Sequence, residues 1–165
     1  MPRRYRLPPG FRIVSGGQTG ADRAGLDWAI AHGIAHGGWC PQGRRAEDGP
    51  IDPRYMLFET PSREYRQRTG WNVRDSDATV IFTFAGSLSG GSELTAVFAD
   101  QYRRPWLHLR DNDEPHRLAD FLEHHSGRQP VLTLNIAGVR DPALGPLVVR
   151  VLDQALVLPG ADAGR

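Results

Sequence analysis

The stretch Ile13-Val14-Ser15-Gly16-Gly17-Gln18-Thr19-Gly20-Ala21-Asp22 decides how the first part of this chain folds. An apolar run from Phe11 to Val14 stops at paired glycines, and a helix-compatible segment follows from Ala21 to Ala31. A strand that turns into a helix leaves backbone N–H groups free, and the helix dipole makes them a site for anions. Glycine has no Cβ to keep a phosphate away from that backbone. The candidate ligand-binding residues here are Ser15, Gly16, Gly17, Gln18, Thr19, Gly20 and Asp22.

An ordinary turn with a helix cap at Thr19 or Asp22 also explains this stretch. The pattern is not G-x-G-x-x-G, and the chain contains no lysine, which excludes a Walker A loop. The prediction of an anion site therefore depends on a second glycine loop later in the sequence.

That second loop follows the clearest strand of the chain. Residues 77–84 are nearly continuously apolar and β-branched, which is typical of a buried parallel strand. A helix should follow to about Tyr102, with Leu94, Val97 and Phe98 facing inward. Two strands that each end in a glycine loop indicate one shared crevice, the usual ligand site of α/β sheets. The candidate ligand-binding residues of the second loop are Gly90, Gly91, Ser92 and Thr95.

A polar loop, residues 40–53, separates these two units and is too rich in proline and glycine for a helix or strand interior. Irregular loops of this length are more often functional than not. Arg44 and Arg45 are candidate clamps for an anionic ligand. Glu47 and Asp48 either bind the polar edge of a ring or pair with those two arginines.

A helix is expected from Ser62, as its N-cap, to Asp75. Arg68, Thr69 and Asn72 would share one face of it, and the segment has few apolar residues for a core stripe. The helix is therefore either a solvated surface element or one whose polar face lines a binding cleft, and Arg68 with Asn72 suits the second alternative.

The remaining strands are expected at residues 33–39, 55–60, 105–109 and 131–138, and the remaining helices at 115–125 and from 141 or 142 to about 158. Strands that alternate with helices predict an α/β fold with a doubly wound, mostly parallel sheet of five or six strands flanked by helices. We expect one ligand-binding domain over residues 11–159, a disordered lead-in over 1–10 and a flexible tail over 160–165.

Composition excludes several classes of function. The net charge of +1 argues against a nucleic-acid-binding protein, and no apolar run approaches the roughly 20 residues that span a bilayer. The N-terminal residues lack the apolar stretch of a secretory signal, so a cytoplasmic protein without a membrane partner is expected. The single cysteine, Cys40, excludes an internal disulfide, and the six histidines lack ligand spacing, so no protein-bound metal is expected.

Taken together, these motifs resemble those of the molybdenum-cofactor carrier protein family, which is Rossmann-like and related to the lysine-decarboxylase-like phosphoribohydrolases. The resemblance covers about residues 11–145. The matching segments are 15–22 (SGGQTGAD), 40–44 (CPQGR), 46–50 (AEDGP), 65–69 (YRQRT), 72–79 (NVRDSDAT), 88–92 (LSGGS), 94–95 (LT) and 134–138 (LNIAG).

The resemblance implies a Rossmann-like homodimer or homotetramer that holds molybdenum cofactor, or molybdate, without transforming it. The cofactor is a phosphorylated pterin, so the implied partners are this small molecule and, as recipients, molybdoenzyme apo-proteins. A glycine loop would hold the phosphate, with Gly90-Gly91-Ser92 slightly favoured. Arg44, Arg45 or Arg68 would hold an oxyanion, and Glu47, Asp48 or Asn72 would meet the pterin edge.

The alternative is an enzyme that hydrolyses the N-glycosidic bond of a nucleoside monophosphate, as the related phosphoribohydrolases do. Those relatives carry P-G-G-x-G-T-x-x-E at the second glycine loop, whereas this chain has Glu93-Leu94 at the Gly-Thr pair and Val97 at the glutamate. Valine cannot act as a general acid or base. A carrier is therefore expected ahead of a hydrolase. A hydrolase would need Glu93, Asp48 or Glu59 as its catalytic carboxylate. A nucleotide-sensing module is a further alternative.

Overall fold

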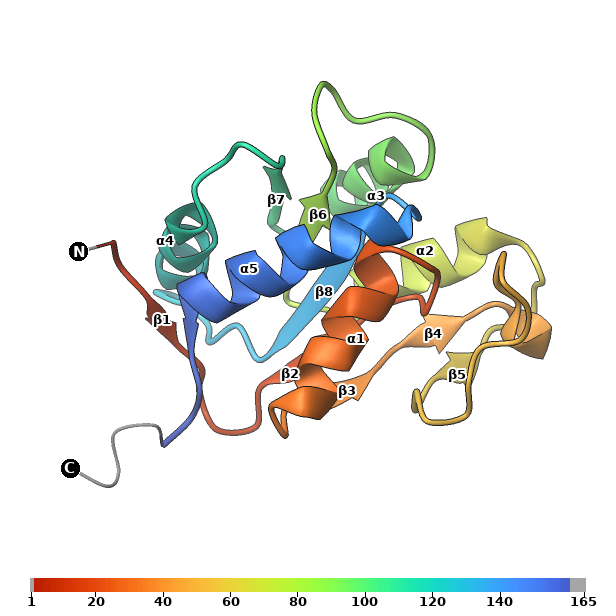
Figure 1. Ribbon diagram of the computed structural model, residues 1–165, viewed down its shortest axis with the longest axis horizontal. Coiled ribbons are helices and arrows are strands. Elements are labelled where there is room, and N and C mark those ends of the chain that lie inside the picture. The colour runs from red at the N-terminus through yellow and green to blue at the C-terminus, as the bar shows by residue number, and fades with distance from the viewer. Residues whose placement is uncertain (1, 161–165) are drawn as a thin grey trace.

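Five parallel strands form the central sheet of the computed structural model, which describes residues 2–160 (Figure 1). Their order across the sheet is β3-β2-β8-β6-β7. The bounds are β2 (Arg12–Val14), β3 (Ala35–Gly37), β6 (Ala78–Phe82), β7 (Trp106–Leu109) and β8 (Thr133–Gly138). Two small parallel pairs lie outside this sheet, β1 (Tyr5–Arg6) with β9 (Leu156–Val157) and β4 (Trp39–Cys40) with β5 (Phe58–Glu59).

The last strand of the sheet in sequence, β8, lies at its centre. Asn135 of β8 is in register with Val14 of β2 on one side and Thr79 of β6 on the other. From β2 the chain goes to β3 on one side, and from β6 it goes to β7 on the other side. This reversal makes the carboxyl end of β8 the switch point of the sheet, and the loops after β2, β6 and β8 meet there.

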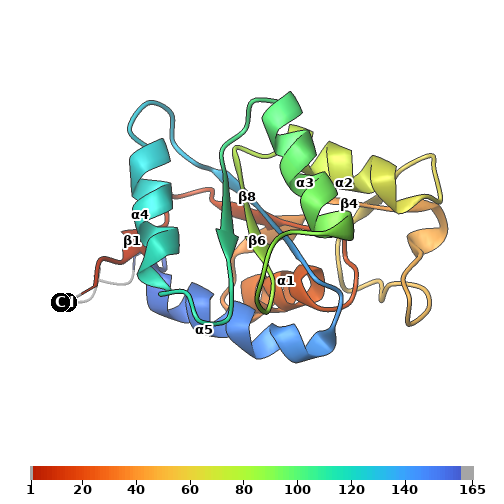
Figure 2. The same cartoon turned by 90° about the horizontal axis from the view of Figure 1, so that it is seen from above.

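The helices cover both faces of the sheet (Figure 2). α1 (Ala21–Ala31) packs against α5 (Gly145–Ala155) on one face, while α2 (Tyr65–Arg74) packs against α3 (Gly90–Gln101) on the other. α4 (His116–His125) packs against α5 and β1. Two 3-10 turns, η1 (Gln42–Arg44) and η2 (Pro142–Leu144), complete the set. In residues 2–160, no helix is long and apolar enough to cross a membrane.

The core confirms the predicted α/β class with an all-parallel, five-stranded sheet. All five residues of β6 are buried, as its continuous apolar sequence predicts. Helix α5 contributes Val148, Val151 and Leu152 to the same cluster as Ile13 of β2. This packing holds the strands in place, and with them the loops that follow their carboxyl ends.

The N-terminal segment differs from the prediction. Tyr5 and Leu7 are buried, and the Tyr5 hydroxyl is 2.7 Å from the Ser126 hydroxyl. A disordered lead-in over residues 1–10 is therefore wrong for residues 5–7, because two apolar side chains and a pairing with β9 hold them. Most of the predicted flexible tail, residues 161–165, lies outside the described residues.

Three helices also differ in detail. α2 begins at Tyr65, and Ser62 lies before it, where its hydroxyl accepts the Glu64 N–H. Val97, predicted to face inward, is 42% exposed, because α3 buries its small residues Ser92, Thr95, Ala96 and Ala99 instead. The final helix ends at Ala155, since the next two residues form β9.

Candidate functional site

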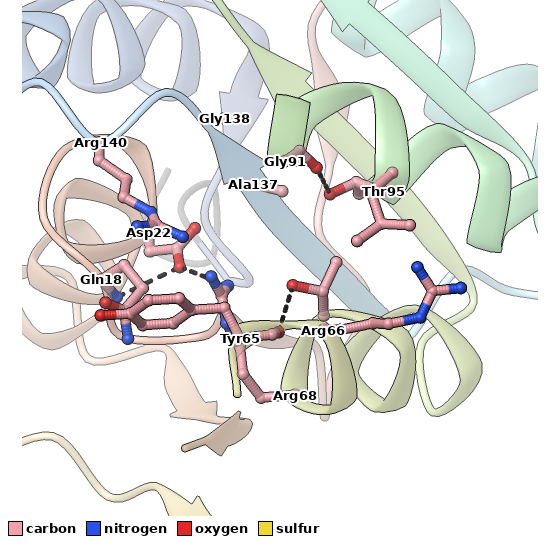
Figure 3. Close-up of a pocket in the computed structure, with 12 residues that line it drawn as sticks. Gln18, Asp22, Tyr65, Arg66, Arg68, Gly91, Thr95, Ala137, Gly138 and Arg140 are labelled. Atoms are coloured by element: carbon pink, nitrogen blue, oxygen red, sulfur yellow. Dashed lines mark hydrogen bonds and ion pairs between the residues drawn. The ribbon is translucent and has the colours of Figure 1, made fainter. Parts of the chain in front are cut away.

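A cleft of about 440 Å³, part of it open to solvent, lies at the carboxyl end of β8 (Figure 3). Its walls come from α1, α2, α3 and the segment that follows β8. It is lined by Gln18, Asp22, Tyr65, Arg66, Arg68, Thr69, Gly91, Leu94, Thr95, Ala137, Gly138 and Arg140. A smaller hollow of about 190 Å³ shares Asp22, Arg68, Thr69, Thr95 and Ala137 with it and reaches Asn135.

A buried ion pair between α1 and α2 forms the floor of the cleft. Arg68 Nη1 donates to Asp22 Oδ2 at 3.3 Å, and the two residues are only 9% and 5% exposed. The Gln18 backbone N–H donates to the same carboxylate oxygen at 3.2 Å. A Cβ on Gly16 would collide with the Arg68 guanidinium and press on the Asp22 carboxylate. Glycine at position 16 therefore makes room for this ion pair.

Burial displaces the titration of both partners toward their neutral forms. It raises the pKa of Asp22 above its ordinary value, and the charges of Arg68 and Arg140 oppose that rise. It also lowers the pKa of Arg68 from its usual range, against the attraction of Asp22. Both directions have the same cause, the loss of water around a charged group.

Two buried polar atoms of the floor have no hydrogen-bond partner in the described part of the chain, Gln18 Oε1 and Arg68 Nε. The other end of the Gln18 amide is engaged, since Nε2 donates to the Arg45 carbonyl at 2.9 Å. That bond identifies which end is the oxygen. Unsatisfied buried polar atoms are rare in folded proteins, because each costs about 1–3 kcal/mol.

The first glycine loop, residues 15–20, folds inward against the protein. The N–H of Gly17 donates to Ser15 Oγ at 3.3 Å, and the N–H of Ala21 donates to the Val139 carbonyl at 3.1 Å. Gly20 has φ +81°, and a Cβ there would collide with Val139. The amides of Gly17, Gln18 and Ala21 are thus occupied, and of residues 15–22 only Gln18 and Asp22 line the cleft. Ligand contact by Ser15, Gly17, Thr19 and Gly20 stays an untested prediction.

The second glycine loop presents free amides at the start of α3. Gly90 and Gly91 form the first turn of α3, and within residues 2–160 no acceptor bonds to either N–H. Gly91 lines the cleft, and Thr95 Oγ1 donates back to its carbonyl at 2.9 Å. Ser92 is buried beside them. The positive end of the α3 dipole therefore faces the cleft together with unoccupied donors, which favours an anion there.

Arg140, Tyr65 and Arg66 also line the cleft, although none of them was among the candidate ligand-binding residues. The Arg140 guanidinium lies 4.1 Å from the centre of the Tyr65 ring, and its Nη1 donates to Glu47 at 3.0 Å. Figure 3 shows Arg140 and Arg68 both approaching Asp22. Arg66 points the other way, with its guanidinium 5.1 Å from the Phe98 ring. The cationic character of the cleft is therefore concentrated at the Arg68–Arg140 end.

The four charged candidates of the polar loop do not line the cleft. The Arg44 guanidinium donates to the backbone carbonyls of Ile51, Asp52, Tyr55 and Leu57. Arg45 donates to the Arg63 carbonyl at 3.0 Å. Glu47 pairs with Arg140, and Asp48 pairs with Arg23, so neither pairs with Arg44 or Arg45. The donors of Arg44 are spent on the loop itself, which leaves its role as an anion clamp without support.

Helix α2 brings Arg68 and Thr69 to the cleft but uses Asn72 structurally. Asn72 Oδ1 accepts the Trp39 N–H at 2.8 Å, and its Nδ2 donates to the Trp39 carbonyl at 2.9 Å. Asn72 thereby holds β4 against α2, and of the cleft and the smaller hollow it lines only the smaller hollow. The polar face of α2 thus has two uses: Arg68 lines the cleft, while Asn72 holds the neighbouring backbone of Trp39.

In residues 2–160, no group of three or more histidine, cysteine, aspartate or glutamate side chains could hold a metal ion. Burial raises the pKa of the Cys40 thiol.

Comparisons with known proteins agree with this fold. A crystal structure described as that of a "putative molybdenum carrier protein" from Syntrophus aciditrophicus SB is similar to this chain, with 44% identity and a TM-score of 0.80. The similarity covers 88% of this chain and 94% of that one. A search of curated proteins gave no match. The circularly permutated YpsA SLOG family matches residues 13–156, and the chain therefore belongs to that family.

Proposed function

We propose that this protein binds a phosphorylated, anionic small molecule in the cleft at the carboxyl end of β8 and holds it without chemical turnover. The observation that carries the proposal is the free amide of Gly91, which lies in the same cleft as Arg68 and Arg140 and next to the free amide of Gly90. A helix N-terminus and guanidinium groups are the usual means of binding phosphate and other oxyanions.

Molybdenum cofactor, or its molybdate moiety, is the ligand that we propose. The support is the similar crystal structure, described as a "putative molybdenum carrier protein" and 44% identical to this chain. In this proposal the phosphate of the cofactor binds the Gly90–Gly91 amides and Arg140. A carrier of this kind would pass the cofactor on to molybdoenzyme apo-proteins.

The placement of the carboxylates supports binding ahead of hydrolysis. Among the described residues that line the cleft, Asp22 is the only carboxylate, and it is ion-paired with Arg68. Glu93 is exposed and outside the cleft lining, Asp48 pairs with Arg23, and Glu59 accepts the Gly43 N–H. A hydrolase needs a general acid or base within hydrogen-bond reach of its substrate.

Thermal-shift and calorimetric titrations would test the proposal with molybdate, tungstate, sulfate, AMP and molybdenum cofactor as ligands. A ligand that prefers the folded state raises the melting temperature by mass action. We expect molybdenum cofactor or molybdate to stabilise the protein, with AMP left intact. Stabilisation by AMP together with release of adenine would overturn the carrier proposal in favour of a hydrolase.

A matched pair of arginine variants locates the binding. Arg140→Ala should weaken binding about 10- to 100-fold, since a hydrogen bond to a charged group contributes about 1.5–3 kcal/mol. Arg128→Ala is the control, because Arg128 is an exposed arginine that precedes the same strand, at the opposite edge of the sheet. Equal loss in both variants would mean that binding is nonspecific attraction by surface charge.

A further inference from the structure

A second concave surface, which we call the edge groove, lies beside the outer strand β3 of the sheet. It measures about 520 Å³, part of it open to solvent, and none of its lining residues also lines the cleft at the carboxyl end of β8. Its floor is closed by buried side chains, while its walls carry aromatic rings and a few polar groups, the usual make-up of a small-molecule site. The lining includes Arg12, Val14, Trp39, Phe58, Asn72 and Asp75.

The aromatic wall of the edge groove is held in position by its neighbours. Trp39 Nε1 donates to Asp75 Oδ2 at 2.9 Å, and the Trp39 ring meets the Trp71 ring edge-on with centroids 4.9 Å apart. The Phe58 ring lies 5.9 Å from the Trp39 ring, tilted by 50°, and Phe58 is nevertheless 70% exposed. A fixed and exposed aromatic wall gains stability when a flat apolar ring covers it, because both surfaces leave water.

Arg12 supplies the uncompensated charge of the edge groove. The other charged group, Asp75, is already neutralised, since Arg74 Nε donates to its Oδ1 at 2.8 Å. The Arg12 guanidinium has no hydrogen bond or ion pair with any other residue of 2–160. Its Nη2 lies 2.5 Å from the position that a Cβ on Gly37 would take, so the absence of a side chain at Gly37 lets the guanidinium lie over β3. The edge groove thus offers one positive charge next to aromatic rings.

We propose that the edge groove is a second ligand site, for a monoanion in which a carboxylate is attached to a flat aromatic ring. The planar fork of a guanidinium matches a carboxylate, and one negative charge balances the single free cation. The ring of the ligand packs against Trp39 and Phe58 in the offset or edge-to-face arrangements that aromatic pairs prefer. This site is independent of the proposed function, because its lining and its ligand both differ from those of the cleft.

The test follows the indole N–H signals of the four tryptophans in the unmodified protein by two-dimensional NMR. The Trp39 indole lies in the wall of the edge groove, and Trp39→Phe identifies its signal. The probes are benzoate, benzamide, which has the same shape without the charge, and acetate, which has the charge without the ring. We expect benzoate to shift the Trp39 signal saturably and to bind at least about threefold more tightly than either of the others.

Variants assign the charge and the ring to their partners. Arg12→Met keeps the apolar stem and removes the cation, so it should abolish the preference for benzoate over benzamide. Gly37→Ala places a Cβ where the guanidinium lies and should weaken benzoate while leaving benzamide unchanged. Phe58→Ser should weaken both ring compounds without unfolding the protein, because Phe58 is exposed. Arg128→Met, at an exposed arginine outside the edge groove, is the control and should change none of these affinities.

Absence of a saturable shift at Trp39, or equal affinity for benzoate and benzamide, would overturn the proposal. Loss of benzoate binding in Gly91→Val but not in Arg12→Met would also overturn it, because the carboxylate would then occupy the cleft. A Trp39 signal that changes with protein concentration alone would show that a second copy covers the edge groove, with the same consequence. Failure of the unmodified protein to bind phosphate would overturn the proposed function and leave this site standing.

Discussion

The buried Asp22–Arg68 ion pair should contribute far more to stability than the Asp48–Arg23 pair, whose atoms lie closer together but at the surface. Asp22→Ala leaves Arg68, which is only 9% exposed, without its carboxylate and takes the acceptor from the Gln18 N–H. Breaking a buried ion pair costs about 3–5 kcal/mol, and an unsatisfied buried N–H adds about 1 kcal/mol. For a chain of this size the melting temperature should fall by about 10 °C or more.

Urea unfolding followed by circular dichroism measures this loss as a lower midpoint with an unchanged slope. Asp48→Ala is the matched control, because Asp48 also pairs with an arginine, Arg23, but its side chain is 50% exposed. Exposed ion pairs contribute at most about 1 kcal/mol, so this variant should unfold nearly as the wild type does.

A double variant tests whether the uncompensated charge is the cause. Asp22→Ala with Arg68→Met removes both charges, and it should recover part of the stability lost in Asp22→Ala, because no guanidinium is then left buried. If the double variant were less stable than the single one, or if Asp48→Ala cost as much as Asp22→Ala, the reasoning from burial would be refuted.

Three further predictions concern binding, the polar loop and acid. Gly91→Val should abolish phosphate binding, measured by calorimetry. It should not lower the melting temperature, because a Cβ at position 91 meets no atom within 4 Å. Retained binding would exclude the N-terminus of α3 as the phosphate site. Arg44→Met should make the loop at residues 45–57 more sensitive to limited proteolysis, because it removes hydrogen bonds to four backbone carbonyls. Ligand affinity should stay unchanged, and a digest like that of the wild type would contradict the prediction. The hydrogen bond from Arg23 lowers the pKa of Asp48 in the folded protein. The ionised Asp48 therefore stabilises the fold above the pKa of an unfolded aspartate, about 3.9, and this stabilisation is lost as the pH falls through the folded pKa. The small loss of stability in Asp48→Asn, at most about 1 kcal/mol at pH 6, should thus shrink when urea unfolding is repeated at lower pH, and a loss that grows in acid would contradict the direction of this pKa shift.

Local sequence predicted the elements of the fold well where a single pattern decides them. The continuous apolar residues of β6 and the helical spacing of residues 21–31 depend only on near neighbours, and both elements formed as predicted. β1 was missed because its two residues gain their pairing from β9, about 150 positions later. Short strands of this kind have no periodicity to detect.

The candidate site was predicted in part, for a reason that lies in long-range geometry. Gln18, Asp22, Arg68 and Gly91 were among the candidates and reach the cleft. Arg140 was missed because a lone arginine after a strand has no motif, and its importance comes from the central position of β8, which sequence order does not reveal. Arg44 donates to four carbonyls of the polar loop, a structural use that its sequence context did not indicate, and its contact with a ligand stays a prediction.

The central position of β8 also affects how the chain is made. Residues 133–138 are synthesised after the four strands that surround them, so the facing edges of β2 and β6 stay open until most of the chain has left the ribosome. Open strand edges can pair with those of other chains, and assembly from distant segments is slow. The strand that creates the ligand cleft therefore also closes the sheet, so a nascent chain acquires its binding site and its protection from aggregation in the same late step.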